Sequence, residues 1–418
     1  MNVNLKTLFF VLLAFSVSVF ARPTVIYTGV YSVSSEKKLG NTRELAPVFF
    51  QILAKWQDAG KLPFDLILET DAEETKHLAA DPISMAFLVT RDDFEVEHFK
   101  KIGVTKTTAN FGITALFYQS RLSDKGSVNT ILASIPLNSY MTNEKPLTNE
   151  NIEAERPKMT RKIVADLIQN KFFKRVQRIG IEEIKVNVFC SGEGCFVENY
   201  GKSGLEVGQS VSVKLSGVGE DLFVKASDGS LEMSPETYST LKKAQNVEGF
   251  ASNLKGYSEE TWQVVNVKIT SKKAAEIFKR EPIQSQMAQW YSDFLSETGK
   301  AVLPPISGLE WTQNSMGYTE MILAKADGEM ESFAMAPAKY RLILGISGVA
   351  SGVVEQNNIN QIWAYKLWLT RQVNKRKEEE AEYTTSKKVV VQTQEHRDVD
   401  VFRDLLHVST KTFAQKGK

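Results

Sequence analysis

Two hydrophobic periods alternate along the chain, one of about two residues and one of about 3.6. The first predicts half-buried strands and the second predicts amphipathic helices. In the first half the pattern predicts strands at 23–29, 64–68, 85–88, 110–119 and 129–141, and helices at 45–57, 71–80 and 156–176. The apolar residues Leu45, Phe49, Leu53 and Trp56, for example, fall on one helical face.

The C-terminal third repeats this order of elements. We expect strands at 301–305, 340–352, 361–372 and 381–394, and helices at 318–326 and 399–413. A charged turn, residues 374–380, is expected to join the last two strands. The shared order of strand, helix, strands and closing helix suggests two similar units within one chain.

The segment between these units is rich in short strands and glycine turns. Strands are predicted at 184–189, 196–200, 210–215, 222–225 and 264–269, with a short helix at 235–243. Residues 205–213 alternate between apolar and polar positions, which is typical of a half-buried strand. We therefore expect a small β-barrel or sandwich here. A helical segment over 274–298, interrupted at Pro282, should follow it.

The predicted fold class is α+β, layered as α/β, with two similar strand-helix-strand units flanking a small, mostly-β module. The predicted domains are an α/β domain at 22–180, the β-module at 181–275, a helical linker at 276–298 and a second α/β domain at 299–418. A chain of this length has room for two or three domains.

Residues 1–21 resemble a secretory signal peptide. Lys6 precedes an apolar run over 8–20, and small residues precede a cleavage site after Ala21. The run is shorter than the roughly 20 residues of a membrane span, although a retained anchor is the alternative. No cysteine lies near the cut, so a lipid anchor is not expected. The sequence predicts an exported protein, periplasmic or extracellular.

The two cysteines lie close together. Cys190 ends one predicted strand, Cys195 begins the next, and a glycine-rich turn separates them. A hairpin of this kind places both thiols within disulfide distance, and an exported protein meets an oxidising compartment. We predict a Cys190–Cys195 disulfide, with two free thiols as the alternative. The pair alone has too few ligands for a zinc site.

The charge balance argues against a nucleic-acid partner. The chain has 51 Lys and Arg against 50 Asp and Glu, a net charge of +1. Loss of Lys6 with the leader would bring this to zero, and no basic stripe is present. No later apolar run is long enough to span a membrane, so a mature chain without a transmembrane segment is expected.

Enzyme and cofactor signatures are missing from the pattern. The glycine-rich segment 345–352 matches neither a dinucleotide-binding loop nor a nucleophile elbow. The four histidines show no zinc-binding spacing. Paired acids such as Glu73–Glu74 and Asp92–Asp93 can act as acid and base, but here a helix start explains the first pair and a strand turn explains the second. We expect no catalytic residue, no cofactor and no metal.

Two segments resemble known envelope proteins. Residues 301–305, Ala-Val-Leu-Pro-Pro, resemble the first strand and turn of CsgG-like, LpoB-like and TolB-N-terminal-like α/β domains. Residues 204–213 resemble the opening of the small β-module of the flagellar assembly protein FlgT. The resemblance implies a non-enzymatic envelope protein that docks on other proteins. The chain lacks the lipidation cysteine of CsgG, so pore formation is not implied.

The leading prediction is an exported bacterial cell-envelope scaffold or accessory protein whose partners are other envelope proteins. A candidate interaction surface comprises Trp363 and Tyr365, on one strand face, with Lys375, Arg376 and Lys377 in the charged turn. Packing between sheet and helix is the alternative for the aromatic residues, and a solvated hairpin loop is the alternative for the charged turn. Two other functions stay open: a periplasmic solute-binding protein with its ligand between the α/β units, and an envelope hydrolase. The sequence indicates neither the partner nor the oligomeric state.

Overall fold

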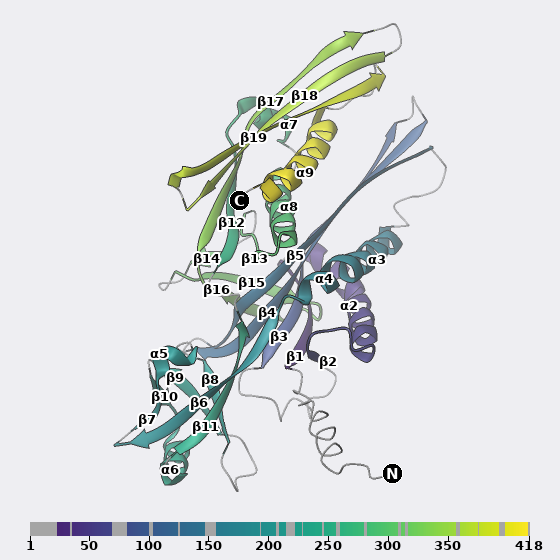
Figure 1. Cartoon of the computed structure of the whole chain (residues 1–418). Helices are drawn as coiled ribbons and strands as arrows, with labels where there is room; N and C mark the ends of the chain where they lie inside the picture. Colours follow the sequence, from purple (N-terminus) through teal and green to yellow (C-terminus); the bar gives the residue numbers. More distant parts are fainter. Residues whose placement is uncertain are drawn as a thin grey trace, which may run out of the picture.

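The chain combines three β-sheets with helices that cover their faces (Figure 1). The computed structural model describes residues 23–33, 36–68, 82–99, 103–123, 126–146, 156–192, 194–205, 209–214, 222–227, 229–244, 246–255, 260–279, 282–307, 311–313, 317–356, 360–374, 376–392 and 398–416. The mixture of helix and strand expected from the sequence is confirmed. The predicted signal peptide and the predicted helix at 71–80 lie outside the described residues.

The first sheet is built mainly from the N-terminal part of the chain. Its strands are β1 (Thr24–Val33), β2 (Asp65–Leu68), β3 (Ile83–Phe99), β4 (Val104–Ser123) and β5 (Gly126–Pro146). Strand β1 runs parallel to β2 and β3, whereas β3, β4 and β5 form an antiparallel meander. Helix α2 (Glu36–Asp58) and the helical segment α3 (Arg156–Asp166), η3 (Leu167–Phe172) and α4 (Phe173–Val176) pack on one face.

Both faces of this sheet are buried. Alternate side chains of a strand point to opposite faces, so neighbouring residues belong to different cores. Phe87, for example, packs against the helices, and the next residue, Leu88, belongs to a core on the other face. That second core includes Leu303 and Ile306 from far along the chain. The first sheet therefore needs a second covering layer, which later residues supply.

Strands β14 (Thr312–Gln313), β15 (Thr319–Lys325) and β16 (Met330–Met335) supply part of that layer. Strand β16 pairs in parallel with β5, and β15 pairs antiparallel with both β16 and β1. The ring β1–β3–β4–β5–β16–β15 therefore closes on itself. Its interior holds Phe333, which contacts Tyr31 and Tyr118 edge to face.

The prediction of a helix at 318–326 is wrong, because this segment is strand β15. Met321 and Leu323 point into the closed ring, and Ile322 points outward with 61% of its surface exposed. Four consecutive apolar residues at 321–324 hide the two-residue alternation, so periodicity cannot separate strand from helix here.

A second sheet has the order β13–β12–β17–β18–β19. Its strands are β12 (Thr261–Ile269), β13 (Ala301–Val302), β17 (Tyr340–Gln356), β18 (Asn360–Val373) and β19 (Arg376–Gln392). Strand β12 is parallel to β13 and β17, and β17, β18 and β19 form an antiparallel meander. This is the order β2–β1–β3–β4–β5 of the first sheet.

The correspondence between the two units extends to their β-bulges. The fifth residue of β1, Thr28, and the fifth residue of β12, Val265, are each unpaired in the parallel register. The eighth residues of β3 and β17, Thr90 and Ser347, are extra in the antiparallel register. A bulge twists and bends its strand, so shared positions give the two sheets the same local bends.

The second unit therefore begins at β12. The sequence pattern had placed its start later, at residue 299. Strand β12 was expected in the β-module, and the short strand β13, over Ala301–Val302, takes the place of β2 rather than of β1. The segment 276–298 was expected to be a linker. It contains α8 (Ile283–Glu297), whose Trp290 and Tyr291 are fully buried in the core of the second unit.

Two helices flank α8 in this unit. Helix α7 (Lys272–Ile277) ends before the predicted break at Pro282, and α9 (Asp398–Lys416) closes the unit. Helices α8 and α9 pack together between the two sheets (Figure 1). Residues 376–380 of the charged run predicted as a turn lie instead at the start of β19, because Val373 pairs directly with Arg376. Asn374 has a positive φ of 51°, as a tight two-residue turn requires.

The middle segment forms a closed six-stranded barrel, in the order β10–β7–β6–β11–β8–β9. Its strands are β6 (Gly180–Ser191), β7 (Gly194–Val197), β8 (Ser210–Lys214), β9 (Leu222–Ser227), β10 (Ser230–Glu232) and β11 (Asn246–Lys255). The short helices α5 (Tyr200–Ser203) and α6 (Pro235–Ala244) lie against it. Valine and leucine side chains fill its interior. The barrel occupies one end of the molecule (Figure 1).

Candidate functional site

The candidate surface predicted around Trp363 and Tyr365 is not assembled as an exposed aromatic strip. Tyr365 is fully buried, packs edge to face on Phe402 and donates a hydrogen bond to Asp398 at 3.0 Å. Trp363 is partly buried and stacks beside Tyr365. The alternative of packing between sheet and helix therefore holds for this pair. Lys375 lies outside the described residues, and Arg376 and Lys377 lie in β19.

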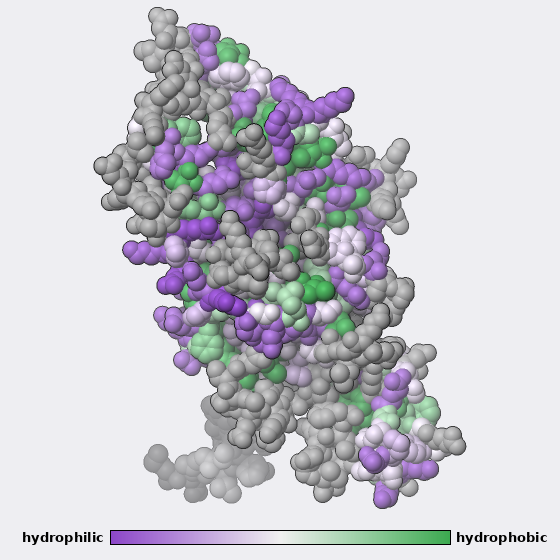
Figure 2. All heavy atoms as spheres, turned by 180° about the vertical axis from the view of Figure 1, so that it is seen from behind, coloured by the Kyte–Doolittle hydropathy of each residue, from purple (hydrophilic) through white to green (hydrophobic). Residues whose placement is uncertain are grey.

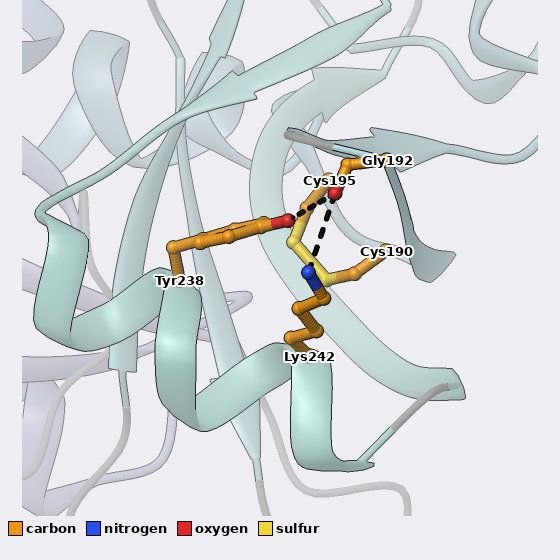
Figure 3. Close-up of a disulfide and its surroundings, with 5 residues drawn as sticks. All are labelled: Cys190, Gly192, Cys195, Tyr238 and Lys242. Atoms are coloured by element: carbon orange, nitrogen blue, oxygen red, sulfur yellow. Dashed lines mark hydrogen bonds between the residues drawn. A yellow bond between two sulfur atoms is a disulfide. The ribbon is translucent and has the colours of Figure 1, made fainter.

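The predicted disulfide is present, and it ties together the ends of strands β6 and β7. Cys190 and Cys195 are directly opposite in the antiparallel register, with their Cα atoms 4.0 Å apart. Helix α6 holds the turn between them. The Tyr238 hydroxyl and the Lys242 ammonium both donate to the Gly192 carbonyl oxygen, at 2.6 and 3.4 Å (Figure 3). The hairpin is therefore fixed by a covalent bond and by a neighbouring helix.

An exposed aromatic pair lies next to the disulfide. Phe189 and Phe196 face each other across β6 and β7, with ring centroids 5.7 Å apart. Their side chains point away from the barrel interior and keep 38% and 37% of their surface exposed. We call this pair, together with Asn187, Glu198 and Glu248 on the same side, the hairpin face.

A shallow groove of about 550 Å³ adjoins the aromatic pair on the hairpin face. Two carboxylates line it, Glu198 and Glu248. Glu198 accepts a hydrogen bond from Asn187 at 3.1 Å, and Glu248 forms an ion pair with Lys185 at 2.6 Å. The groove therefore combines an apolar patch with acidic side chains, a composition that suits an apolar segment carrying basic residues.

The sequence reasoning did not single out the hairpin face, although a signal was present. Each phenylalanine is next to a cysteine and beside a valine, Val188 or Val197, that points into the barrel. Alternation along the strand therefore places both rings outside. Figure 2 shows that hydrophobic side chains elsewhere form only small groups on a mostly hydrophilic surface seen from behind. An ordered aromatic pair on such a surface is a candidate contact site.

The junction between the two α/β units is built around buried charges. Asp293 of α8 is 1% exposed, and its carboxylate forms ion pairs at 2.7 Å with both Lys171 and Arg175. Arg175 also pairs with Glu297 at 3.2 Å. The two cations extend past the edge of β5 and donate to the carbonyl oxygens of residues 138 and 136. They cap this sheet edge and fasten α8 to the first unit.

A second candidate site, the junction pocket, lies beside these ion pairs and has a volume of about 330 Å³. The first unit contributes Ile135, Arg175, Arg178 and Ile179, and the second contributes Glu260, Trp262, Ser296, Gly299, Lys300, Ala301 and Tyr340. Trp262 and Tyr340 are stacked with centroids 4.3 Å apart. The lining of the pocket thus combines aromatic and cationic side chains.

His407 is the histidine with a clearly unusual environment in the described part of the chain. Its ring packs against Tyr140, Trp290 and Phe294 at centroid distances of 4.7, 5.0 and 5.4 Å. Burial, and secondarily the charge of Lys171, lower its pKa to about 4. The imidazole is therefore neutral at physiological pH and belongs to the junction core.

The paired acids at 92–93 are both engaged by arginines. Asp92 accepts a hydrogen bond from Arg156 at 3.1 Å, and Asp93 forms an ion pair with Arg91. The other predicted acid pair lies outside the described residues. Within the described ranges no three His, Cys, Asp or Glu side chains are grouped as metal ligands would be.

Comparisons with known proteins assign this chain to no family. No family model matches the sequence, and no curated protein is significantly similar to it. Among solved structures, a minor lipoprotein from Acinetobacter baumannii is similar to 37% of this chain, over 91% of its own length. Its sequence identity is 9% and the TM-score is 0.20, so the similarity assigns neither a family nor a function. No helix among the described residues is long and apolar enough to cross a membrane.

Proposed function

We propose that this chain is an exported bacterial envelope protein that works by binding another protein through the hairpin face, and that it is not an enzyme. The observation that carries the proposal is the exposed Phe189–Phe196 pair held in place by the disulfide and by α6. The N-terminal sequence pattern and the disulfide both support export.

The rigidity of the hairpin face matters because binding costs conformational entropy. Aromatic side chains that are already fixed in their bound geometry lose little freedom on association. Here the disulfide, the cross-strand pairing and the hydrogen bonds to Gly192 have fixed the backbone under both rings. Interfaces commonly depend on a few aromatic anchors surrounded by polar contacts, which is the arrangement of this surface.

The side chains that line the groove limit the kind of segment a partner could place there. Glu198 and Glu248 border the aromatic pair, so the matching segment would carry an apolar side chain near a Lys or Arg. The absence of enzymatic activity remains part of the proposal. It is supported by the arginine partners of Asp92 and Asp93, which leave neither carboxylate placed as a free acid or base.

A photo-crosslinking experiment in cells tests this function. A photoreactive phenylalanine analogue at position 196 should give a discrete crosslinked species, because this ring would contact the partner. The matched control is the same analogue at Ile322, which is 61% exposed on β15 of the first sheet.

The crosslink from position 196 should also weaken strongly in a Glu198→Lys, Glu248→Lys background, since the groove would then repel a basic segment. Crosslinks of the same pattern and yield from positions 196 and 322 would contradict the proposal. So would a species that persists unchanged in the charge-reversed background.

A further inference from the structure

The junction pocket contains two cations, Arg178 and Lys300, whose charge is not fully offset by a neighbouring carboxylate. Arg178 donates to the Ser296 carbonyl oxygen at 3.3 Å, and this is a neutral partner. Lys300 has its ammonium 3.7 Å from the centroid of the Trp262 ring. Across the described residues, neither side chain has a carboxylate within ion-pair distance.

The other charged residues of the lining are already paired. Arg175 is neutralised by Asp293 and Glu297. Glu260 is 71% exposed and lies 3.7 Å from the ammonium of Lys339, so this carboxylate is only loosely paired and offsets part of the charge of Lys300. The remaining positive charge of the pocket is concentrated at Arg178 and Lys300, one from each α/β unit.

The position of Lys300 is set by its neighbours. Its ammonium lies over Trp262, which is itself stacked on Tyr340, so the charge is held against an aromatic wall. Burial, followed by repulsion from Arg371, lowers the pKa of Lys300, and attraction by Glu260 offsets these effects only in part. A bound anion would offset both effects.

Gly299 lines the pocket next to Arg178. Its φ of 91° is positive, a conformation that favours glycine, and a Cβ there would lie 3.6 Å from the Arg178 guanidinium, at ordinary contact distance. Ile135 and Ile179 complete an apolar floor.

We propose that the junction pocket binds a small organic acid, with its carboxylate between Arg178 and Lys300 and its apolar body against Trp262, Tyr340 and Ile135. A monoanion fits better than a phosphate dianion, because Glu260 lies in the same lining and would repel a second negative charge. A guanidinium and an ammonium are the usual protein partners of a carboxylate. This site is independent of the hairpin face.

Such a ligand would contact both α/β units at once. Arg178 follows α4 of the first unit, whereas Lys300 and Trp262 belong to the second. Because a ligand that binds only the folded, assembled junction stabilises that state, binding should raise the unfolding temperature of the full chain.

Ligand-observed NMR on the full-length protein tests the site, with phenylacetate as the probe and phenylacetamide as its neutral counterpart. We expect saturable binding of phenylacetate and much weaker binding of phenylacetamide. Lys300→Gln and Arg178→Gln should each weaken phenylacetate binding by about tenfold, since each removes one charged hydrogen-bond donor. Lys279→Gln, which removes an exposed lysine on the connection after α7, is the matched control and should bind as the wild type does.

Each variant is first compared with the wild type for its unfolding temperature without ligand, so that loss of binding is not loss of folding. Equal binding of phenylacetate and phenylacetamide, or no saturable binding of phenylacetate at millimolar concentration, would overturn the proposal. Unchanged affinity in both Lys300→Gln and Arg178→Gln would do the same. Tighter binding of phenyl phosphate than of phenylacetate would overturn the assignment to a monoanion.

Discussion

At the scale of single residues, His407 shows how burial lowers the pKa of a histidine and so links its protonation to folding. The ring is enclosed by Tyr140 and Trp290 and lies near Lys171, Lys411 and Asp293. Desolvation and the two lysines disfavour its protonated form, and Asp293 only partly compensates. The folded chain therefore holds this imidazole neutral where an unfolded chain would protonate it.

The pKa of His407 leads to a prediction for stability against pH. Its pKa is about 4 when folded and 6.5 in its model state, so between these values the unfolded chain binds more protons. The free energy of unfolding should fall as the pH drops from about 6.5 to about 4, by at most about 3 kcal/mol from this residue.

Denaturant titrations of the wild type and of His407→Gln at pH 7 and pH 4.5 measure this effect. The variant should lose less stability than the wild type between the two pH values. Equal losses would show that His407 does not carry the pH dependence.

At the scale of elements, some features can be predicted from the sequence and others cannot. The disulfide was predictable because two strand patterns and a glycine turn bring the cysteines together locally. Strand β15 could not be predicted, because the apolar run over residues 321–324 fits a helix equally well. The strand conformation of the charged residues that begin β19 could not be predicted either, because their charge does not reveal that Val373 and Arg376 are paired.

The disulfide of the hairpin face carries the second stability prediction. Cys190 and Cys195 are separated by five positions, so the bond closes a short loop. Chain entropy over such a loop gives about 2 kcal/mol of stabilisation. The double variant Cys190→Ser, Cys195→Ser should therefore unfold at lower denaturant concentration, with the loss confined to the barrel if the units unfold separately.

Hydrogen exchange of the hairpin amides gives a local readout for the same variant. Exchange should speed up in β6 and β7, while the amides of β17 and β18 serve as internal controls. Treating the wild type with reductant should reproduce the change, and the serine variant should not respond to reductant. Protection that is the same with and without the bond would contradict this role.

At the scale of the whole molecule, the features that could not be predicted from the sequence depend on contacts between distant segments. Strand β12 pairs with β17, more than 70 residues later, and the junction pocket draws Arg178 and Lys300 from separate units. Local periodicity carries no information about such partners. The order of elements was readable from the sequence, whereas the start of the second unit and the composition of the pocket depend on tertiary contacts.

The junction itself yields the third stability prediction. Asp293→Asn would leave Lys171 and Arg175 next to a neutral group in a buried position. Loss of one partner from a buried ion pair typically costs about 3–5 kcal/mol. We expect a loss of this size in the free energy of unfolding, measured by denaturant titration.

Glu297→Gln is the matched control, because Glu297 is more exposed than Asp293 and lies 3.2 Å from Arg175. Its effect should be clearly smaller. A loss at Asp293 no larger than the loss at Glu297 would show that the two units are held together mainly by other contacts.

The closed ring of the first unit has a consequence for how the chain is made. The C-terminal end of β1, Tyr31–Val33, and strand β5 acquire their second neighbours only when β15 and β16 arrive, about 180 residues after the end of β5. Synthesis proceeds from the N-terminus, so for that interval the first sheet has open edges and an uncovered apolar face. Open edges of this kind recruit other strands. We therefore expect the chain to be most prone to aggregation during synthesis, before its second half has emerged.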